Sequence, residues 1–182
     1  NKRMREILDK RLQSWRRPEV LLFLMAASGT ICFAVWQALL NNFSIERAAF
    51  TGVEMGILQS LREVPGFLSF TVVFLLLLVR EQPLALISLL VLGIGTAITG
   101  MFPTIIGLYC TTVLMSVGFH YFEAVHTSLA LQWVDKDRAP ETLGRLISVK
   151  AAASIVTFGG VWVAFDFMGL DYVWVYLLGG CA

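Results

Sequence analysis

The chain alternates between long apolar segments and short polar interruptions. A helix needs about 20 consecutive apolar residues to cross a bilayer, and the pattern predicts six such segments. The last one is too short to cross about 30 Å of hydrocarbon, so we expect a helix that is cut short in a fragment of a longer protein. The predicted spans are residues 20–40, 51–79, 84–101, 104–133, 143–165 and 172–182.

The segment before the first span has a different pattern. Residues 1–18 place apolar side chains at helical spacing, with Lys and Arg on the opposite face. This pattern predicts a cytoplasmic amphipathic helix on the membrane surface, the alternative being a solvated tail. The predicted organisation is therefore this N-terminal segment followed by a transmembrane bundle over residues 19–182.

Composition supports a membrane protein. Hydrophobic residues make up 57% of the chain, charged residues only 15%, and the mean hydropathy is +0.75. Soluble domains are about 45–50% apolar and about 25% charged. Because the apolar runs lack the period-two alternation of barrel strands, we predict an all-α fold, a polytopic membrane helical bundle of about six spans.

The distribution of charge predicts the orientation. The net charge of +1 gives no sign of an acidic partner such as nucleic acid. With the N-terminus inside, the inner loops carry Arg80, Lys136, Arg138 and, at the edge of the fifth span, Arg145, whereas the outer loops carry only Arg47. The positive-inside rule therefore predicts a cytoplasmic N-terminus in a cell membrane, the inner or plasma membrane.

Two ionisable residues lie in the middle of the second span. A charged side chain at a helix centre costs about 2.5–3.5 kcal/mol on insertion scales, so Arg62 and Glu63 should face protein or a wet cavity. As neighbours they point about 100° apart, and we expect at least one to find its partner on another helix. Pro65 and Gly66 predict a kink there. A transport role is one interpretation, and a structural interhelical ion pair is the other.

The fourth span carries three ionisable residues on one helical face. His120, Glu123 and His126 are spaced three residues apart, which favours proton or substrate contact. They are also weak metal candidates, and a structural polar cluster is a third reading. We predict no bound metal and no cofactor. Haem is excluded because two histidines on one helix cannot ligate its opposite faces.

Two further polar residues are candidates for the same cavity. Lys150 lies about two turns into the fifth span, and Gln37 is the best polar candidate in the first. The chain contains no Walker loop, nucleophile elbow, HExxH or dinucleotide fingerprint. We therefore expect no enzyme.

Several segments together resemble a known transporter family. The first span ends in WQALLNNF, the second begins GVEMGILQS, and a charged loop with Gly144 and Arg145 (WVDKDRAPETLGRLISV) precedes the fifth. In these features the chain resembles the N-terminal six-helix half of a major facilitator superfamily transporter. The resemblance covers nearly the whole chain.

The resemblance implies a 3+3 inverted repeat and transport by alternating access. It implies a secondary transporter of a small polar or charged solute, a permease and symporter coupled to protons. Its partners would be the lipid bilayer, a small-molecule or ion substrate and the missing C-terminal half, with no nucleic acid. Arg62 and Lys150 would hold an anionic group or a coupling carboxylate. The residues expected to couple protons are Glu63, His120, Glu123 and His126.

Two alternatives stay open. The inner loop LLLLVREQPLA lacks the Asp and Gly of the family's Gly-x-x-x-Asp-x-x-Gly-Arg motif, which favours a non-transporting, permease-like membrane module. The third hypothesis is a metal-ion permease that uses the face of His120, Glu123 and His126.

Overall fold

The computed structural model describes residues 18–182, in which every regular element is helical. The predicted amphipathic segment lies outside the described residues except for Pro18. The elements are α2 (Pro18–Ala48), α3 (Gly52–Phe67), η1 (Leu68–Thr71), α4 (Val72–Leu76), α5 (Glu81–Thr99), α6 (Ile105–Trp133), η2 (Lys136–Arg138), α7 (Ala139–Asp166) and α8 (Tyr172–Gly180).

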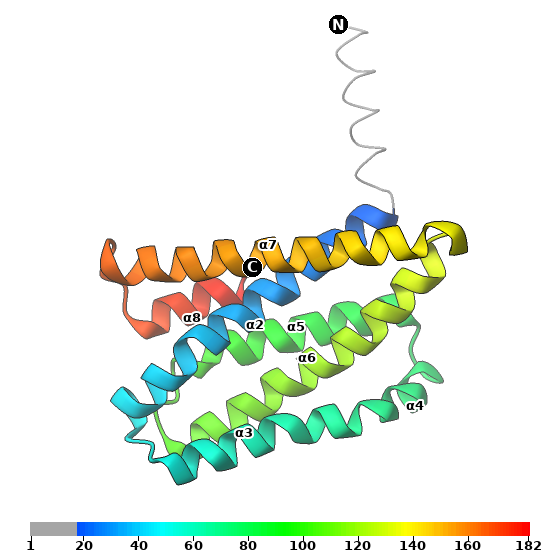
Figure 1. Cartoon of the computed structure of the whole chain (residues 1–182). Helices are drawn as coiled ribbons and strands as arrows, with labels where there is room; N and C mark the ends of the chain where they lie inside the picture. Colours follow the sequence, from blue (N-terminus) through cyan, green and yellow to red (C-terminus); the bar gives the residue numbers. More distant parts are fainter. Residues whose placement is uncertain (1–17) are drawn as a thin grey trace, which may run out of the picture.

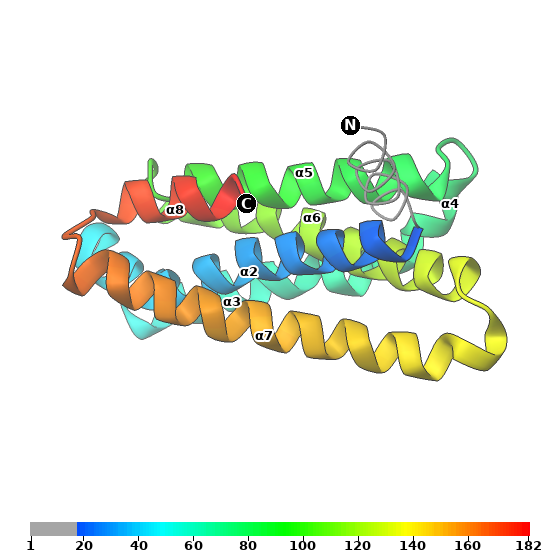
Figure 2. The ribbon, with the colours of Figure 1, turned by 90° about the horizontal axis from the view of Figure 1, so that it is seen from above.

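The helices form two layers. In Figure 1, α7, α2, α6 and α3 follow one another from top to bottom, with α5 and α8 behind them. Figure 2 shows α5 and α8 on the side opposite α7. Within the front layer α7 packs on α2, α2 on α6 and α6 on α3, and α5 contacts both α6 and α8. Consecutive long helices run antiparallel, so the loops alternate between the two ends of the bundle, as the predicted spans require.

Among residues 18–182, four helical segments are long and apolar enough to cross a membrane: α2, α5, α6, and α7 together with η2. They indicate a membrane-embedded protein. Large apolar side chains are exposed along α4 and α7, as lipid contact would require. Leu78 is 85% exposed and Val156 is 74% exposed, a poor arrangement in water but a favourable one in hydrocarbon.

The second predicted span, residues 51–79, differs from one continuous helix. It is divided into α3, η1 and α4, which run on from one another along the lower edge of Figure 1. Pro65 lies inside α3, which ends two residues later, because proline removes a backbone donor and crowds the preceding turn. Glu54, an ionisable residue near the start of that span, accepts a hydrogen bond from the Thr51 backbone N–H (2.9 Å) in a capping box.

Small residues bring α5 and α6 together. A Cβ added to Gly118 would lie 2.3 Å from the backbone nitrogen of Leu92, and one added to Gly95 would lie 2.6 Å from the backbone of Met115. Neither space would admit a side chain without moving the backbone. Close approach at glycine is how membrane helices gain packing contacts when lipid offers no hydrophobic drive between them.

The end of the bundle that holds the α7–α8 loop is tied by polar contacts. Arg47 at the end of α2 forms an ion pair of 2.7 Å with Asp171, and the Tyr172 hydroxyl donates to Glu46 at 2.9 Å. α8 begins at this end and runs beside α5 and α2. These contacts set the direction in which α8 enters the bundle.

Candidate functional site

Arg62 and Glu63 form an ion pair on α3. Arg62 Nε and Nη2 donate to Glu63 Oε1 at 2.9 and 2.6 Å. The Arg62 side chain is 26% exposed and that of Glu63 is 61% exposed. We call these two residues the α3 pair.

The α3 pair corrects one expectation from the sequence. Helical geometry places adjacent side chains about 100° apart, from which we expected at least one of them to find its partner on another helix. In the structure the long guanidinium group folds back along α3 to the neighbouring carboxylate. The separation at Cα is overcome because Arg carries its charge at the end of a flexible stem.

A cavity of about 230 Å³ lies beside the α3 pair. We call it the polar cavity. Its lining comes from α2 (Phe33), α3 (Arg62, Glu63) and α6 (Met115, Ser116, Phe119, His120). The Phe33 and Phe119 rings are stacked with their centroids 4.2 Å apart. Charged and aromatic surfaces therefore meet in one cavity.

His120 occupies its place because Gly66 has no side chain. A Cβ on Gly66 would lie 2.7 Å from His120 Cε1, so the imidazole rests on the α3 backbone directly after Pro65. Ser116, one turn earlier on α6, donates a short hydrogen bond to the Arg62 carbonyl. This bond ties α6 to the backbone of α3 three residues before Pro65.

Glu123 and Lys150 form a second ion pair, which joins α6 to α7. Lys150 Nζ lies 2.8 Å from Glu123 Oε1 and 2.7 Å from Oε2. The Glu123 side chain is 35% exposed and that of Lys150 is 29% exposed. We call these two residues the α6–α7 pair. α7 packs far more on α2 than on α6, so this pair is a principal link between α6 and α7.

His126 lies deeper than the other candidates. It is 2% exposed, its Nε2 donates to the Leu22 carbonyl of α2 at 2.9 Å, and its ring packs on Phe122. It also lines, together with Lys150, a second cavity of about 210 Å³ between α6 and α7. A buried side-chain bond to a backbone carbonyl is a structural anchor between α2 and α6.

The three ionisable residues on α6 therefore point to three different neighbours. His120 contacts α3, Glu123 pairs with α7, and His126 bonds to α2. Within residues 18–182, no group of three or more His, Cys, Asp or Glu side chains could hold a metal ion. Gln37 is exposed on α2 and is not among the residues that line the two cavities.

Some polar contacts gave no clear signal in the sequence. Glu81 in the first turn of α5 accepts a hydrogen bond from Gln132 Nε2 at 2.8 Å, and Tyr121 on α6 bonds to Thr71 of η1. Ser116 and the Phe33–Phe119 stack likewise have no distinctive signal in the sequence. Ser, Thr and aromatic residues are common in membrane helices, so only their neighbours in space distinguish them.

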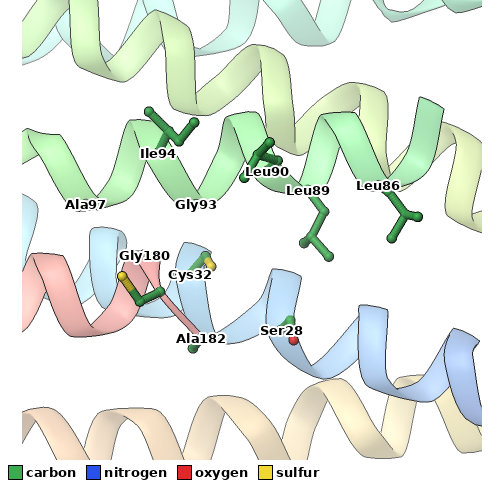
Figure 3. Close-up of a pocket in the computed structure, with 11 residues that line it drawn as sticks. Ser28, Cys32, Leu86, Leu89, Leu90, Gly93, Ile94, Ala97, Gly180 and Ala182 are labelled. Carbon is green, nitrogen blue, oxygen red and sulfur yellow. The ribbon is translucent and has the colours of Figure 1, made fainter. Parts of the chain in front are cut away.

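Another cavity has a different character. A groove of about 480 Å³ lies between α2 and α5 beside the end of α8 (Figure 3). Figure 3 shows Leu86 and Leu89 of α5 extending toward α2, which carries Ser28 and Cys32. No ionisable carboxylate, imidazole or basic group lines it within the described residues. It is an apolar groove and offers little to orient a polar ligand.

Comparison with protein-family models, curated proteins and solved structures found none that matches this chain.

Proposed function

We propose that this protein is a proton-coupled secondary transporter of a small polar solute, working by alternating access, and that the described helices form one half of its transport unit. The observation that carries the proposal is the polar cavity together with the α6–α7 pair. Charged groups on three apolar helices are expensive in a membrane. Such groups mark substrate and proton pathways in membrane proteins.

The packing of the helices supports this proposal. An inverted repeat would exchange α2 with α6, α3 with α7 and α5 with α8. Under that exchange the contact between α2 and α7 corresponds to the contact between α6 and α3, and both are extensive. The contact between α5 and α6 likewise corresponds to that between α8 and α2. These two correspondences support the proposed 3+3 inverted repeat.

The α6–α7 pair offers a mechanism for proton coupling. Protonation of Glu123 removes the carboxylate charge and with it the attraction to Lys150. Because α7 contacts α6 little elsewhere, loss of the pair removes a principal restraint on the position of α7 relative to α6. A proton would in this way change the relative stability of two arrangements of the bundle, which is what alternating access requires.

Proton-driven uptake by proteoliposomes tests the proposal. The protein encoded by the full reading frame would be reconstituted with a pH-sensitive dye inside, and amino acids, sugars and carboxylates would be added outside. We expect one solute class to carry protons inward. Glu123→Gln should abolish this acidification while the protein keeps its elution profile. Glu141→Gln, which removes an exposed carboxylate at the start of α7, serves as the control and should transport normally.

The second candidate function is a non-transporting membrane module. It is favoured by one observation: both ion pairs are already satisfied within the chain. In that case the α6–α7 pair serves helix association alone, and the α3 pair only neutralises two charges within α3. The same assay separates the two candidates. If the protein is a non-transporting module, no added solute will acidify the vesicles. Wild-type transport by Glu123→Gln would instead remove Glu123 from the coupling mechanism.

A further inference from the structure

The charges at the polar cavity sum to zero. Arg62 contributes one positive charge, Glu63 one negative charge, and the two already neutralise each other. The α6–α7 pair is balanced in the same way. In a region of low dielectric, a ligand with a net charge would leave one charge without compensation, which is costly. Electrostatics at this cavity therefore favours a ligand whose own net charge is zero.

The α3 pair also has bonding capacity to spare. Both bonds from Arg62 go to Glu63 Oε1, so Arg62 does not use Oε2. Arg carries five N–H donors and a carboxylate has about four acceptor positions. A ligand carboxylate can bind the guanidinium while a ligand ammonium group binds Glu63. A bound zwitterion would thus form two ion pairs in place of one and leave no charged group without a partner.

The other wall of the polar cavity is apolar. Phe33 and Phe119 stack at 4.2 Å, and Met115 lines the cavity beside them. Its volume of about 230 Å³ is larger than that of an engineered cavity of about 150 Å³ that holds one benzene molecule. This space suits a molecule of amino-acid size, with its charged end at the α3 pair and its side chain on the aromatic rings.

We propose that the polar cavity binds a small zwitterion of the amino-acid type, with its carboxylate on Arg62 and its ammonium group on Glu63. This inference rests on the proposed transport function and specifies its substrate class. It assigns the α3 pair to ligand recognition and leaves proton coupling to the α6–α7 pair. The two pairs can therefore be separated by experiment.

Equilibrium binding to the full-length protein in nanodiscs tests the substrate class. The probes are radiolabelled glycine, alanine, leucine and phenylalanine. For the zwitterion that binds, competition uses two analogues of the same skeleton, one without the amino group and one without the carboxylate; for leucine these are 4-methylpentanoate and 3-methylbutylamine. We expect at least one zwitterion to bind saturably. Both analogues should compete at least about tenfold more weakly, because each leaves one charged group of the α3 pair without a partner.

Variants assign the binding to the α3 pair. Arg62→Gln and Glu63→Gln should each weaken binding by about tenfold or more. Glu63→Gln is the safer variant for folding because that side chain is 61% exposed. Glu141→Gln, which removes an exposed carboxylate at the start of α7, is the control and should bind the zwitterion as the wild type does.

Several results would overturn the zwitterion proposal. These are no binding of any of the four zwitterions, equal competition by the anion or the cation, or unchanged affinity in Glu63→Gln. If the vesicle assay still showed coupled uptake of another solute class, the transport proposal would stand and only the substrate class would fall. Zwitterion binding without any transport would support the binding site and overturn the transport proposal.

Discussion

At the scale of single residues, the candidate site consists of side chains paired in ways that the sequence leaves open. Glu123 and Lys150 are 27 positions apart in sequence and meet through two contacts under 3 Å. Glu141 and Arg145, in contrast, form an exposed pair at i and i+4 on α7. The first pair spans two helices in an apolar bundle, and the second is open to solvent. They should differ in energy for that reason.

A double-mutant cycle would measure this difference. We expect Lys150→Met to lower the free energy of unfolding by about 1–3 kcal/mol, because Glu123 is left partly buried without a partner. Adding Glu123→Gln should recover at least half of that loss. Arg145→Met should cost no more than about 0.5 kcal/mol. Unfolding in mixed micelles measures the free energy of unfolding of each variant. An equal loss of stability in Lys150→Met and Arg145→Met would contradict the prediction.

At the scale of elements, glycine allows α6 to pack closely on α5. Gly118 faces the α5 backbone at Leu92 with no room for a methyl group, whereas Gly56 on α3 has nothing within 4 Å of its added Cβ. The two glycines look alike in the sequence. The first permits helix contact, and the second only adds flexibility to its helix.

Alanine at each glycine should therefore have opposite effects. Gly118→Ala should destabilise the protein by about 1–3 kcal/mol, because the backbone of α5 must move away. Gly56→Ala should be neutral or stabilise it by up to about 1 kcal/mol through helix propensity. Thermal unfolding of the purified protein in detergent compares the two. A Gly118→Ala variant as stable as the wild type would show that α5 and α6 are not packed this closely.

At the scale of the whole molecule, the loops at the two ends carry different charges. Arg80, Lys136 and Arg138 lie in or beside the loops at the end where α2 begins, and Arg138 lies 3.7 Å from Glu19. The opposite end has Arg47 paired with Asp171. This asymmetry supports the proposal that the first end is cytoplasmic.

Cysteine labelling in cells checks that orientation. In a variant with the three cysteines of this sequence replaced by alanine, Lys136→Cys in η2, just before α7, and Asp166→Cys at the last residue of α7 place one thiol near each end of that helix. We expect a membrane-impermeant maleimide to label Asp166→Cys in intact cells and Lys136→Cys only after permeabilisation. The reverse pattern would place the N-terminus outside.

Much of the fold could be predicted from the sequence because lipid imposes simple rules. A long apolar run must form a helix to satisfy its backbone groups, so the predicted spans at residues 20–40, 84–101, 104–133 and 143–165 correspond to α2, α5, α6 and α7. The break in the second span also had a visible cause in Pro65 and Gly66, although its division into three pieces did not follow from them.

The partners of the charged residues could not be predicted. The sequence by itself determined which ionisable residues lie in apolar segments and on which helix each is carried, because hydropathy and the 3.6-residue period are local properties. Only the tertiary structure decided that Arg62 turns to Glu63, Glu123 to Lys150 and His126 to the Leu22 carbonyl. The rotation and depth of each helix relative to its neighbours depend on packing across helices, and no local pattern contains that information.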